Sequence, residues 1–479
     1  MILNNNDNNR RDFIRKSVFA LAGLSLIPGS GFGENSDLYP TTANPEGLPD
    51  GKELKTVAFI ANAYQNSSHA DVIGTKLFLG IPTDDGMVEP RVKIVSMWID
   101  QTGATDAGGR RLSGSLPDAG GTLVGTYDTG VRIAEMNGAV MYPSIAEALC
   151  LGTGKLAVDA VVFIGEHGDY KYNRLGEKLY PRMNYLEQIF RVFDASNRSV
   201  PVYSDKALSY SWLDSKWIYD RARELNVPMM AGSSLPYCWR DPALEHPLGS
   251  KITEAVGIGF ASLDAYGFHV AEILQCMVER RAGGETGVAS VEGLIGKEVW
   301  NAIDSGKISL KLVNAACDKI KGKASGSMRD LVKNPSAVVI RYNDGTRGSI
   351  LMLDEYVNEG WAYAAFANGK TVATEFVLDN SPVYAHFSYL TLNIQKFIVT
   401  GKLTAPIERN LLTSGITDMG IRSLYEGKVK KTPFLNIKYN AKGYEPIRPA
   451  RLRPIVQNLG LWPPKGYEFI IPEEFRKKK

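Results

Sequence analysis

The hydrophobic positions follow two alternating patterns in the first half of the chain. Short runs of consecutive apolar residues, typical of strands buried on both faces, are separated by longer segments with helical spacing. This alternation predicts a parallel sheet with helices on both faces. The expected strands are 56–61, 91–99, 140–142, 158–164, 201–203 and 228–231, with a Gly-rich insertion at 101–129 and a helix at 145–150 that Ser144 caps.

Beyond about residue 250 the pattern changes. A long amphipathic helix is expected over 265–281, ending at Gly283-Gly284. Strands are expected at 337–342, 348–353, 361–367 and 371–377, with a turn at 343–345. The fold class predicted is therefore α/β: a doubly wound parallel sheet, followed by an α+β domain with a large, open, mostly antiparallel sheet.

The first thirty or so residues are expected to be a targeting signal rather than part of the folded domains. The polar stretch that contains Asn9-Arg10-Arg11 is followed by an apolar run at 18–27, which resembles a twin-arginine translocation signal. The run is shorter than the roughly 20 residues of a membrane-spanning helix, and no later segment replaces it. The signal implies the twin-arginine translocase as a partner and a periplasmic or other extracytoplasmic location. A basic helix start on a cytoplasmic protein is the alternative.

Composition and charge exclude several classes of protein. The 479 residues include 44% hydrophobic ones, which is ordinary globular usage. The 55 Lys and Arg against 52 Asp and Glu leave a net charge of +3, too little to hold a nucleic acid. The cysteines are far apart and form no metal-binding spacing, so they are expected to be packed as small hydrophobic residues: Cys150, Cys238, Cys276 and Cys317.

Candidate chemistry gathers where the predicted parallel strands end. Ligands of open α/β sheets lie outside the carboxyl ends of the strands, and the loops there hold titratable residues. Lys206 can bind a substrate hydroxyl and exchange a proton with it, and His167 can act as a base. The expected group comprises His69, Glu166, His167, Asp169, Tyr170, Asp205, Lys206, Ser233 and Ser234. Tyr180-Pro181-Arg182 and the stretch 235–240 are expected to add aromatic and guanidinium surface near this cleft.

Several short motifs, in order along most of the chain, resemble one family. The chain has MYPS at 141–144, VDAV at 158–161, and VYSDK at 202–206 where that family writes a strand ending in Glu-Lys-Pro. YNDGT at 342–346, FIVTGK at 397–402, IER at 407–409 and TPFLNI at 432–437 continue the order. The layout is similar to the glucose-fructose oxidoreductase, inositol dehydrogenase and rhizopine-catabolism (Gfo/Idh/MocA) family. The resemblance divides the chain into four parts: a signal and linker at 1–40, a Rossmann-like domain at 50–245, an α+β substrate and oligomerisation domain at 246–440, and a tail at 441–479.

The resemblance implies an oxidoreductase that uses NAD or NADP and acts on a sugar or cyclitol. It also implies an open sheet that often forms an oligomer interface, so a homo-oligomer is among the expectations. Onto this chain it places a lysine and a histidine as binding and acid/base groups. The catalytic candidates are Lys206, His269, His167, Asp264 and Tyr266. The cofactor-binding candidates are Asn62, Ala63, Asp100, Glu166 and Asp205.

Two departures weaken this picture. The first strand-to-helix turn, 62–70, has no glycine, although a pyrophosphate needs close approach of the backbone there, and Asn62 and Tyr64 would crowd its path. The family pattern commonly places an Asp and a His four residues apart on a helix, so that both side chains point into the cleft. Here Asp264 and His269 are five residues apart, which leaves them roughly 140° apart on a regular α-helix. Either Asp264 lies in the preceding loop or its role has passed to Tyr266.

Three functions therefore stay open. The first is an exported carbohydrate or cyclitol oxidoreductase, with NAD or NADP loaded tightly before export. The second is a nucleotide-independent carbohydrate lyase, hydrolase or isomerase on the same scaffold. The third is a non-catalytic sugar binder. A divalent metal is a further alternative, because imidazole and carboxylate groups at His69, Glu166, His167 and Asp169 suit such ions.

Overall fold

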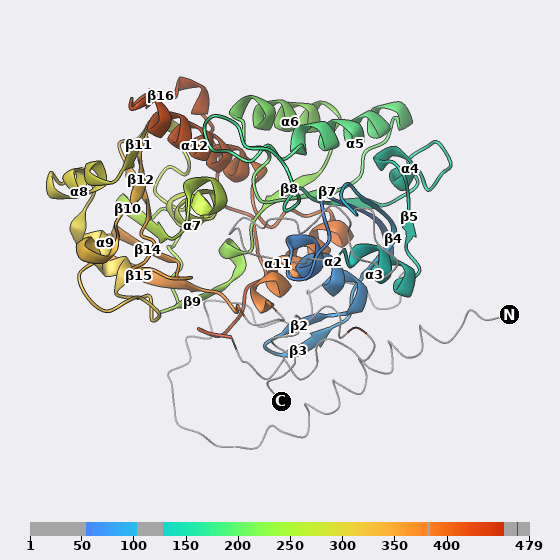
Figure 1. The fold of residues 1–479 in the computed structure, drawn as a ribbon, viewed down its shortest axis with the longest axis horizontal. Coiled ribbons are helices and arrows are strands. Elements are labelled where there is room, and N and C mark those ends of the chain that lie inside the picture. The colour runs from blue at the N-terminus through green and yellow to red at the C-terminus, as the bar shows by residue number, and fades with distance from the viewer. Residues whose placement is uncertain (1–53, 103–127, 381–383, 455–466, 468–479) are drawn as a thin grey trace, which may run out of the picture.

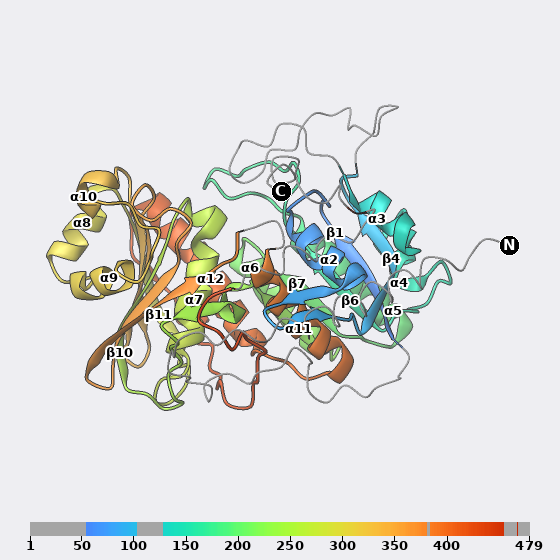
Figure 2. The ribbon, with the colours of Figure 1, turned by 90° about the horizontal axis from the view of Figure 1, so that it is seen from below.

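The computed structural model describes residues 54–102, 128–380, 384–454 and 467. The expected signal, most of the Gly-rich insertion and most of the tail lie outside these ranges. Figure 1 shows a parallel sheet with its helices in blue to green, and a second sheet in yellow to orange beside it. Figure 2 shows the same two halves side by side along the longest axis of the molecule, with α7 and α12 between them. Among the described residues, no helix has the length and apolar character needed to cross a membrane.

The first half is a six-stranded, all-parallel sheet. Its strand order is β5-β4-β1-β6-β7-β8, which in chain order is the 3-2-1-4-5-6 arrangement of a Rossmann fold. The strands are β1 Lys55–Ala61, β4 Val92–Ile99, β5 Val140–Met141, β6 Ala160–Ile164, β7 Val202–Asp205 and β8 Met229–Gly232. The helices are α2 His69–Leu79, α3 Gly130–Asn137, α4 Ile145–Cys150, α5 Arg182–Ser196 and α6 Trp212–Glu224. The hairpin β2 Ile81–Thr83 and β3 Gly86–Val88 follows α2.

The second half is an eight-stranded sheet in the order β16-β11-β12-β13-β10-β14-β15-β9. Among these described strands, β10 and β13 pair in parallel and the other pairs are antiparallel, as expected. The strands are β9 Trp239–Asp241, β10 Ile252–Gly259, β11 Val288–Ile295, β12 Ser336–Tyr342, β13 Arg347–Met352, β14 Ala362–Ala367, β15 Lys370–Val377 and β16 Lys430–Lys431. The helices are η2 Leu235–Tyr237, the π-helix η3 Leu263–Gly267, α7 Phe268–Val278, α8 Lys297–Asp304, α9 Leu310–Cys317, α10 Met328–Leu331, α11 Ala385–Thr400, α12 Ile407–Glu426 and η4 Pro433–Leu435.

The predicted fold class is confirmed, and local signals explain several elements. Ser144 caps α4 by accepting the Glu147 amide, and the helix spans the residues expected. The helix expected over 265–281 is shorter, and a π segment precedes it. Strand β9 lies before residue 246, yet it pairs with β15 of the second sheet. The sequence pattern did not predict β2–β3, α11 or α12.

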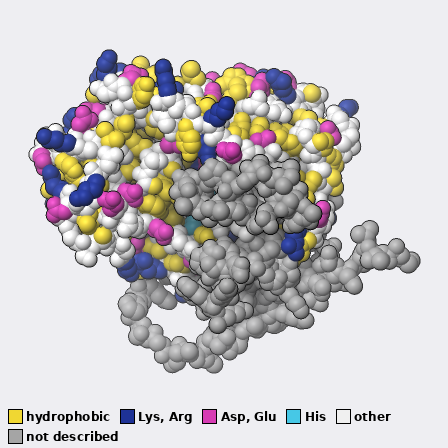
Figure 3. Space-filling model, viewed as in Figure 1, with side chains coloured by type: hydrophobic (Ala, Val, Ile, Leu, Met, Phe, Trp, Pro, Cys, Tyr) yellow, Lys and Arg dark blue, Asp and Glu magenta, His cyan; other side chains and the backbone are white. Residues whose placement is uncertain are grey.

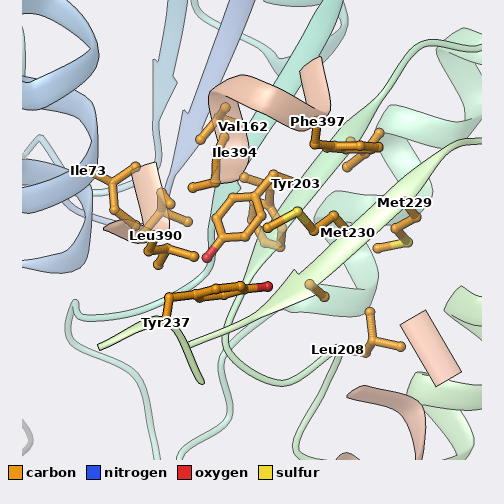
Figure 4. Packing of buried hydrophobic residues seen from close by; sticks show 14 of the residues in the cluster. Ile73, Val162, Tyr203, Leu208, Met229, Met230, Tyr237, Leu390, Ile394 and Phe397 are labelled. Atoms are coloured by element: carbon orange, nitrogen blue, oxygen red, sulfur yellow. The ribbon is translucent and has the colours of Figure 1, made fainter. Parts of the chain in front are cut away.

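One continuous hydrophobic core joins both halves. Helix α12 contacts β11 of the second sheet and α6 of the first half, while α11 packs on α2. Figure 4 shows Leu390, Ile394 and Phe397 of α11 with Tyr203 of β7 and neighbouring strand residues. A smaller core lies under α8 and α9 on the other face of the second sheet. The four cysteines are buried and free, as predicted.

The described part of the tail fastens the junction between the halves. Asn393 of α11 exchanges two hydrogen bonds with the backbone of Ile447, at 2.7 and 2.9 Å. Arg448 donates to Glu245 at 2.6 Å, and Arg453 donates to Asp241 at 2.5 Å.

The surface carries charges of both signs. Lys and Arg side chains are mixed with Asp and Glu on the face that Figure 3 shows.

The packing of α12 on β11 depends on Gly293. A Cβ there would lie 2.4 Å from the Gly420 carbonyl oxygen and 2.7 Å from the Leu424 amide nitrogen, both backbone atoms of α12. We expect Gly293→Ala to lower the free energy of unfolding by roughly 1–3 kcal/mol, because the helix must shift. Thermal unfolding measures this loss. Gly322→Ala is the matched control, since a Cβ there meets nothing within 4 Å; equal melting temperatures for both variants contradict the packing.

Candidate functional site

Two residues at the carboxyl edge of the parallel sheet have an uncommon backbone conformation. His167, after β6, has φ of 65°, and Lys206, after β7, has φ of 56°. Non-glycine residues rarely adopt this left-handed region, and such strain gathers at functional sites. Asn410 of α12 donates to the Lys206 carbonyl at 2.8 Å, and the Lys206 amide donates to the Gly232 carbonyl at 3.1 Å. The surrounding structure therefore holds the strained turn in place.

Glu166 lies between two cations. Lys206 Nζ donates to its Oε2 at 3.1 Å, and Arg182 Nη2 donates to its Oε1 at 2.5 Å. Burial alone would raise the pKa of the Glu166 carboxyl, but Lys206 and Arg182 hold it well below its usual range. Arg182 also donates to the Asp205 carbonyl at 2.5 Å. Arg182 lies beside the cleft as expected, but its side chain is 3% exposed and braces the loops after β6 and β7.

Two histidines, His69 and His167, lie near Glu166. His69, the first residue of α2, has its Nδ1 2.7 Å from Oδ2 of the fully buried Asp205. The rings of His167 and Phe387 lie 5.4 and 4.8 Å from the His69 ring. Burial, and then the proximity of His69, lower the pKa of His167 to about 3, so its ring is neutral near pH 7. Its Nε2 is buried with no hydrogen-bond partner.

The π segment resolves the five-residue spacing between Asp264 and His269. Hydrogen bonds in a π-helix span five residues, so positions five apart fall about one turn apart. Asp264 therefore belongs to the helix rather than to a preceding loop. Burial, followed by Lys206 and His69, lowers the pKa of His269 well below its usual value. Tyr266 packs its ring against Trp361 at 5.5 Å and against His269 at 5.8 Å.

A cavity of about 130 Å³ brings part of the predicted site together. Glu166, Lys206 and Asp264 line it, with Lys178 and three tyrosines around them. Burial raises the pKa of Asp264 to about 6, although the Lys178 amide, 3.4 Å from its Oδ2, opposes this rise. Such a pKa suits a group that takes and returns protons near neutral pH. The tyrosines are Tyr172, Tyr180 and Tyr210.

The first strand-to-helix turn does not fit a diphosphate. The Tyr64 side chain lies beneath α2, where its hydroxyl is 2.8 Å from Thr75 Oγ1. The expectation that Tyr64 would crowd the path of the pyrophosphate is therefore wrong. However, the Asp71 carboxylate accepts the Ser67 amide at 2.9 Å at the start of the helix. Burial raises the pKa of Asp71 to about 6. A carboxyl oxygen of the chain itself thus occupies an amide at the helix N-terminus, where a diphosphate needs free amides.

The chain itself covers the same turn. The amide of Thr129, just before α3, donates to the Tyr64 carbonyl at 2.9 Å, and Asp128 forms a β-bridge with Gln65. Asn62 and Ala63 are fully buried, and neither polar atom of the Asn62 side chain has a hydrogen-bond partner. The turn is therefore closed by protein groups on both sides.

Asp100, one of the expected cofactor-binding residues, is hydrogen-bonded within the protein. Tyr170 donates its hydroxyl to Asp100 Oδ2 at 2.6 Å, and burial together with this bond raises the pKa of Tyr170 above its usual value. Asp169, next to it, exchanges backbone hydrogen bonds with the Gln101 side chain at 2.7 and 3.1 Å. The long loop after β6 therefore covers the end of β4.

Other expected groups lie apart from the cavity. Within the described residues, no cluster of three or more His, Cys, Asp or Glu side chains is arranged to hold a metal ion. The expectation of aromatic and guanidinium surface at 235–240 is wrong, because Tyr237, Trp239 and Arg240 are each at most 3% exposed.

The sequence reasoning missed Glu272, which accepts the Ser233 amide at 2.6 Å. Its position on α7, three residues after His269, is the signal that could have found it.

Comparison with known proteins finds likeness at the level of fold. No protein-family model and no curated protein matches the sequence. Similar solved structures include GenD2 from gentamicin A biosynthesis in complex with NAD, with 13% identity over 80% of this chain and 99% of that one, and a TM-score of 0.48. Another is myo-inositol 2-dehydrogenase from Lactobacillus plantarum, with 9% identity over 79% and 99% and a TM-score of 0.45. Biliverdin reductase from Synechocystis sp. PCC 6803 has 10% identity over 77% and 98% and a TM-score of 0.40. The likeness to these three structures is one of fold.

The closed turn predicts that nicotinamide nucleotides do not stabilise this protein. Millimolar NAD(H) or NADP(H) should leave the melting temperature unchanged, whereas a ligand at 100 times its Kd adds about 2.7 kcal/mol of stability. Differential scanning fluorimetry gives the melting temperature, and mass spectrometry of the denatured protein detects any nucleotide that was already bound. A rise in melting temperature or a released nucleotide contradicts the prediction.

Proposed function

We propose that this protein is a nucleotide-independent enzyme that moves a proton on a carbohydrate or cyclitol, as a lyase or isomerase. One observation carries the proposal: Lys206, Glu166 and Asp264 line the same small cavity at the carboxyl edge of the parallel sheet. An ammonium group and a carboxyl whose pKa burial raises to about 6 are the two groups that such a proton transfer needs. The closed first turn supports a reaction without a dinucleotide.

Each of the three residues has a distinct role in this reaction. The Asp264 carboxylate takes a proton from the carbon next to a carbonyl group of the substrate. The electron pair left behind moves onto the carbonyl oxygen, where the Lys206 ammonium stabilises the negative charge. The enediolate gives an isomer when the proton returns to the former carbonyl carbon and the proton of the neighbouring hydroxyl moves to the oxygen on that carbon. It gives a lyase product when the electron pair returns and expels a β-substituent, which leaves as its hydroxyl with the proton that Asp264 had taken. Glu166 positions the ammonium through the 3.1 Å hydrogen bond.

The cavity walls suit a polyhydroxylated ring. Tyr172, Tyr180 and Tyr210 offer aromatic faces, and Lys178 lies over the rings of Tyr172 and Tyr180 at 5.7 and 5.6 Å. Sugar rings combine apolar C–H faces with hydroxyls, so they are recognised by aromatic faces together with charged hydrogen-bonding groups. A substrate that carries both a carbonyl and several hydroxyls fits these walls.

A second candidate is the NAD(P)-dependent oxidoreductase that the family resemblance implies. Its support is that Lys206 and Asp264 line the same cavity, and that the charge of Lys206 acts on His269, which follows Asp264 on the same helical segment. The family resemblance implies a lysine and a histidine in these roles. It needs a nucleotide site that the first turn does not provide. Turnover that depends on added or bound NAD(P) would favour it over proton transfer alone.

Export is part of the proposal. The sequence around Asn9-Arg10-Arg11 supports delivery to an extracytoplasmic compartment by the twin-arginine translocase. We expect the double substitution Arg10→Lys and Arg11→Lys to retain the protein in the cytoplasm of a host with this translocase. Arg15→Lys makes the same chemical change nearby but leaves the arginine pair intact, so it serves as the matched control. Fractionation and immunoblotting measure the distribution, and unchanged export of the double variant contradicts the assignment.

Proton transfer is tested by exchange with solvent deuterium. We expect the protein, without nucleotide, to incorporate deuterium from D2O into a member of a panel of ketoses, keto-glycosides and inososes, read by mass spectrometry. Lys206→Met and Asp264→Asn should slow this exchange by roughly 10²–10⁴-fold. Lys216→Met and Asp220→Asn, which alter an exposed ion pair on α6, are the matched controls. Exchange that needs NAD(P), or that survives both site substitutions, contradicts the proposal.

The pH dependence separates Asp264 from a structural role. Its ionised form is the base, so the exchange rate should rise with pH and level off above an inflection near pH 6. The nearby Lys206 ammonium lowers the pKa of Asp264, so residual exchange in Lys206→Met should have its inflection at higher pH. Asp264→Asn should lose the inflection. A pH profile that is the same in all three proteins contradicts the assignment.

A further inference from the structure

A second cavity continues the first one outward. Its volume is about 420 Å³, and it shares four lining residues with the inner cavity: Gly176, Ser262, Asp264 and Ile421. The inner cavity alone, at about 130 Å³, is smaller than the roughly 300–1,000 Å³ of small-molecule sites, whereas the outer one lies within that range. The two cavities are therefore adjacent, and Asp264 lines both of them.

The outer cavity has walls of mixed character. Lys333, Asn334 and Ser336, around the start of β12, and Asp354 and Glu355, after β13, offer donors and acceptors. Ile295, Val332 and Leu424 add apolar surface beside them. This mixture suits another polyhydroxylated unit better than an apolar tail, because hydroxyls need partners when they leave water.

Two non-glycine residues of this wall have left-handed backbone. Ala261, next to the π segment, has φ of 61°, and Glu355 has φ of 71°. Strain of this kind persists where the surrounding structure holds a ligand-binding geometry. The charges of the wall are one lysine against Asp264, Asp354 and Glu355, so an anionic unit would be repelled.

We propose that the substrate is a glycoside of at least two rings, with its reacting unit in the inner cavity and a neutral second unit in the outer one. This inference rests on the proposed function. Asp264 then lies near the bond that joins the two units, and Lys206 contacts the inner unit. The preference for a substrate of two rings over one of a single ring comes from contacts of the second unit with the wall of the outer cavity.

Binding is tested by calorimetry, which needs no turnover. Neutral keto-disaccharides, lactulose and maltulose, are compared with fructose and with a disaccharide that carries a uronic acid as its second unit. We expect at least one neutral disaccharide to bind about ten-fold or more tightly than fructose and than the acidic disaccharide, which corresponds to about 1.4 kcal/mol. Equal affinities, or no binding of any neutral disaccharide, overturn the inference.

A variant that fills the outer cavity localises the effect. Asn334→Trp should remove the advantage of the disaccharide and leave the affinity for fructose unchanged, while Asn314→Trp, on the exposed side of α9, should change neither. Loss of affinity for both ligands, or for neither, overturns the placement. Deuterium exchange on the same ligands keeps the two proposals apart: tight disaccharide binding without exchange refutes the proton chemistry alone, and exchange without length preference refutes the outer site alone.

Discussion

The buried carboxylate of Glu166 is the interaction on which the site depends. It joins three segments that are distant in sequence: its own loop after β6, Lys206 after β7, and Arg182 at the start of α5. A buried charge that loses one partner typically costs about 3–5 kcal/mol, so the position of each of the three groups depends on the other two. Because Arg182 also binds the Asp205 carbonyl, the same contact fixes the strained backbone that presents the Lys206 ammonium to the cavity.

The first turn shows how a Rossmann scaffold can keep its sheet while closing its usual ligand site. The strand order is that of a Rossmann fold, but the Asp71 carboxyl accepts an amide hydrogen bond at the place where a diphosphate would accept it. Thr129 and Asp128 then cross the turn. The cavity lies further along the sheet edge, at the ends of β6 and β7, where the side chains of Glu166 and Lys206 line it.

Much of the fold could be predicted from the sequence, because buried parallel strands and capped helices such as α4 leave local patterns. Convergence of Lys206 and Glu166 followed from the rule that ligands lie at the carboxyl ends of parallel strands. The π segment could not be predicted, since it packs against α12 and β13, which are distant in sequence. A regular helix places Asp264 and His269 on different faces. The bracing role of Arg182 was missed for a similar reason: a guanidinium beside Pro181 is typical of a surface, and its partners Glu166 and Asp205 come from other loops.

The fastening of the tail has a consequence for biosynthesis. Ile447, Arg448 and Arg453 bind Asn393, Glu245 and Asp241, which lie where the two sheets meet. These three residues leave the ribosome after every strand of both sheets. The clamp across the junction is therefore completed only once both sheets have been synthesised.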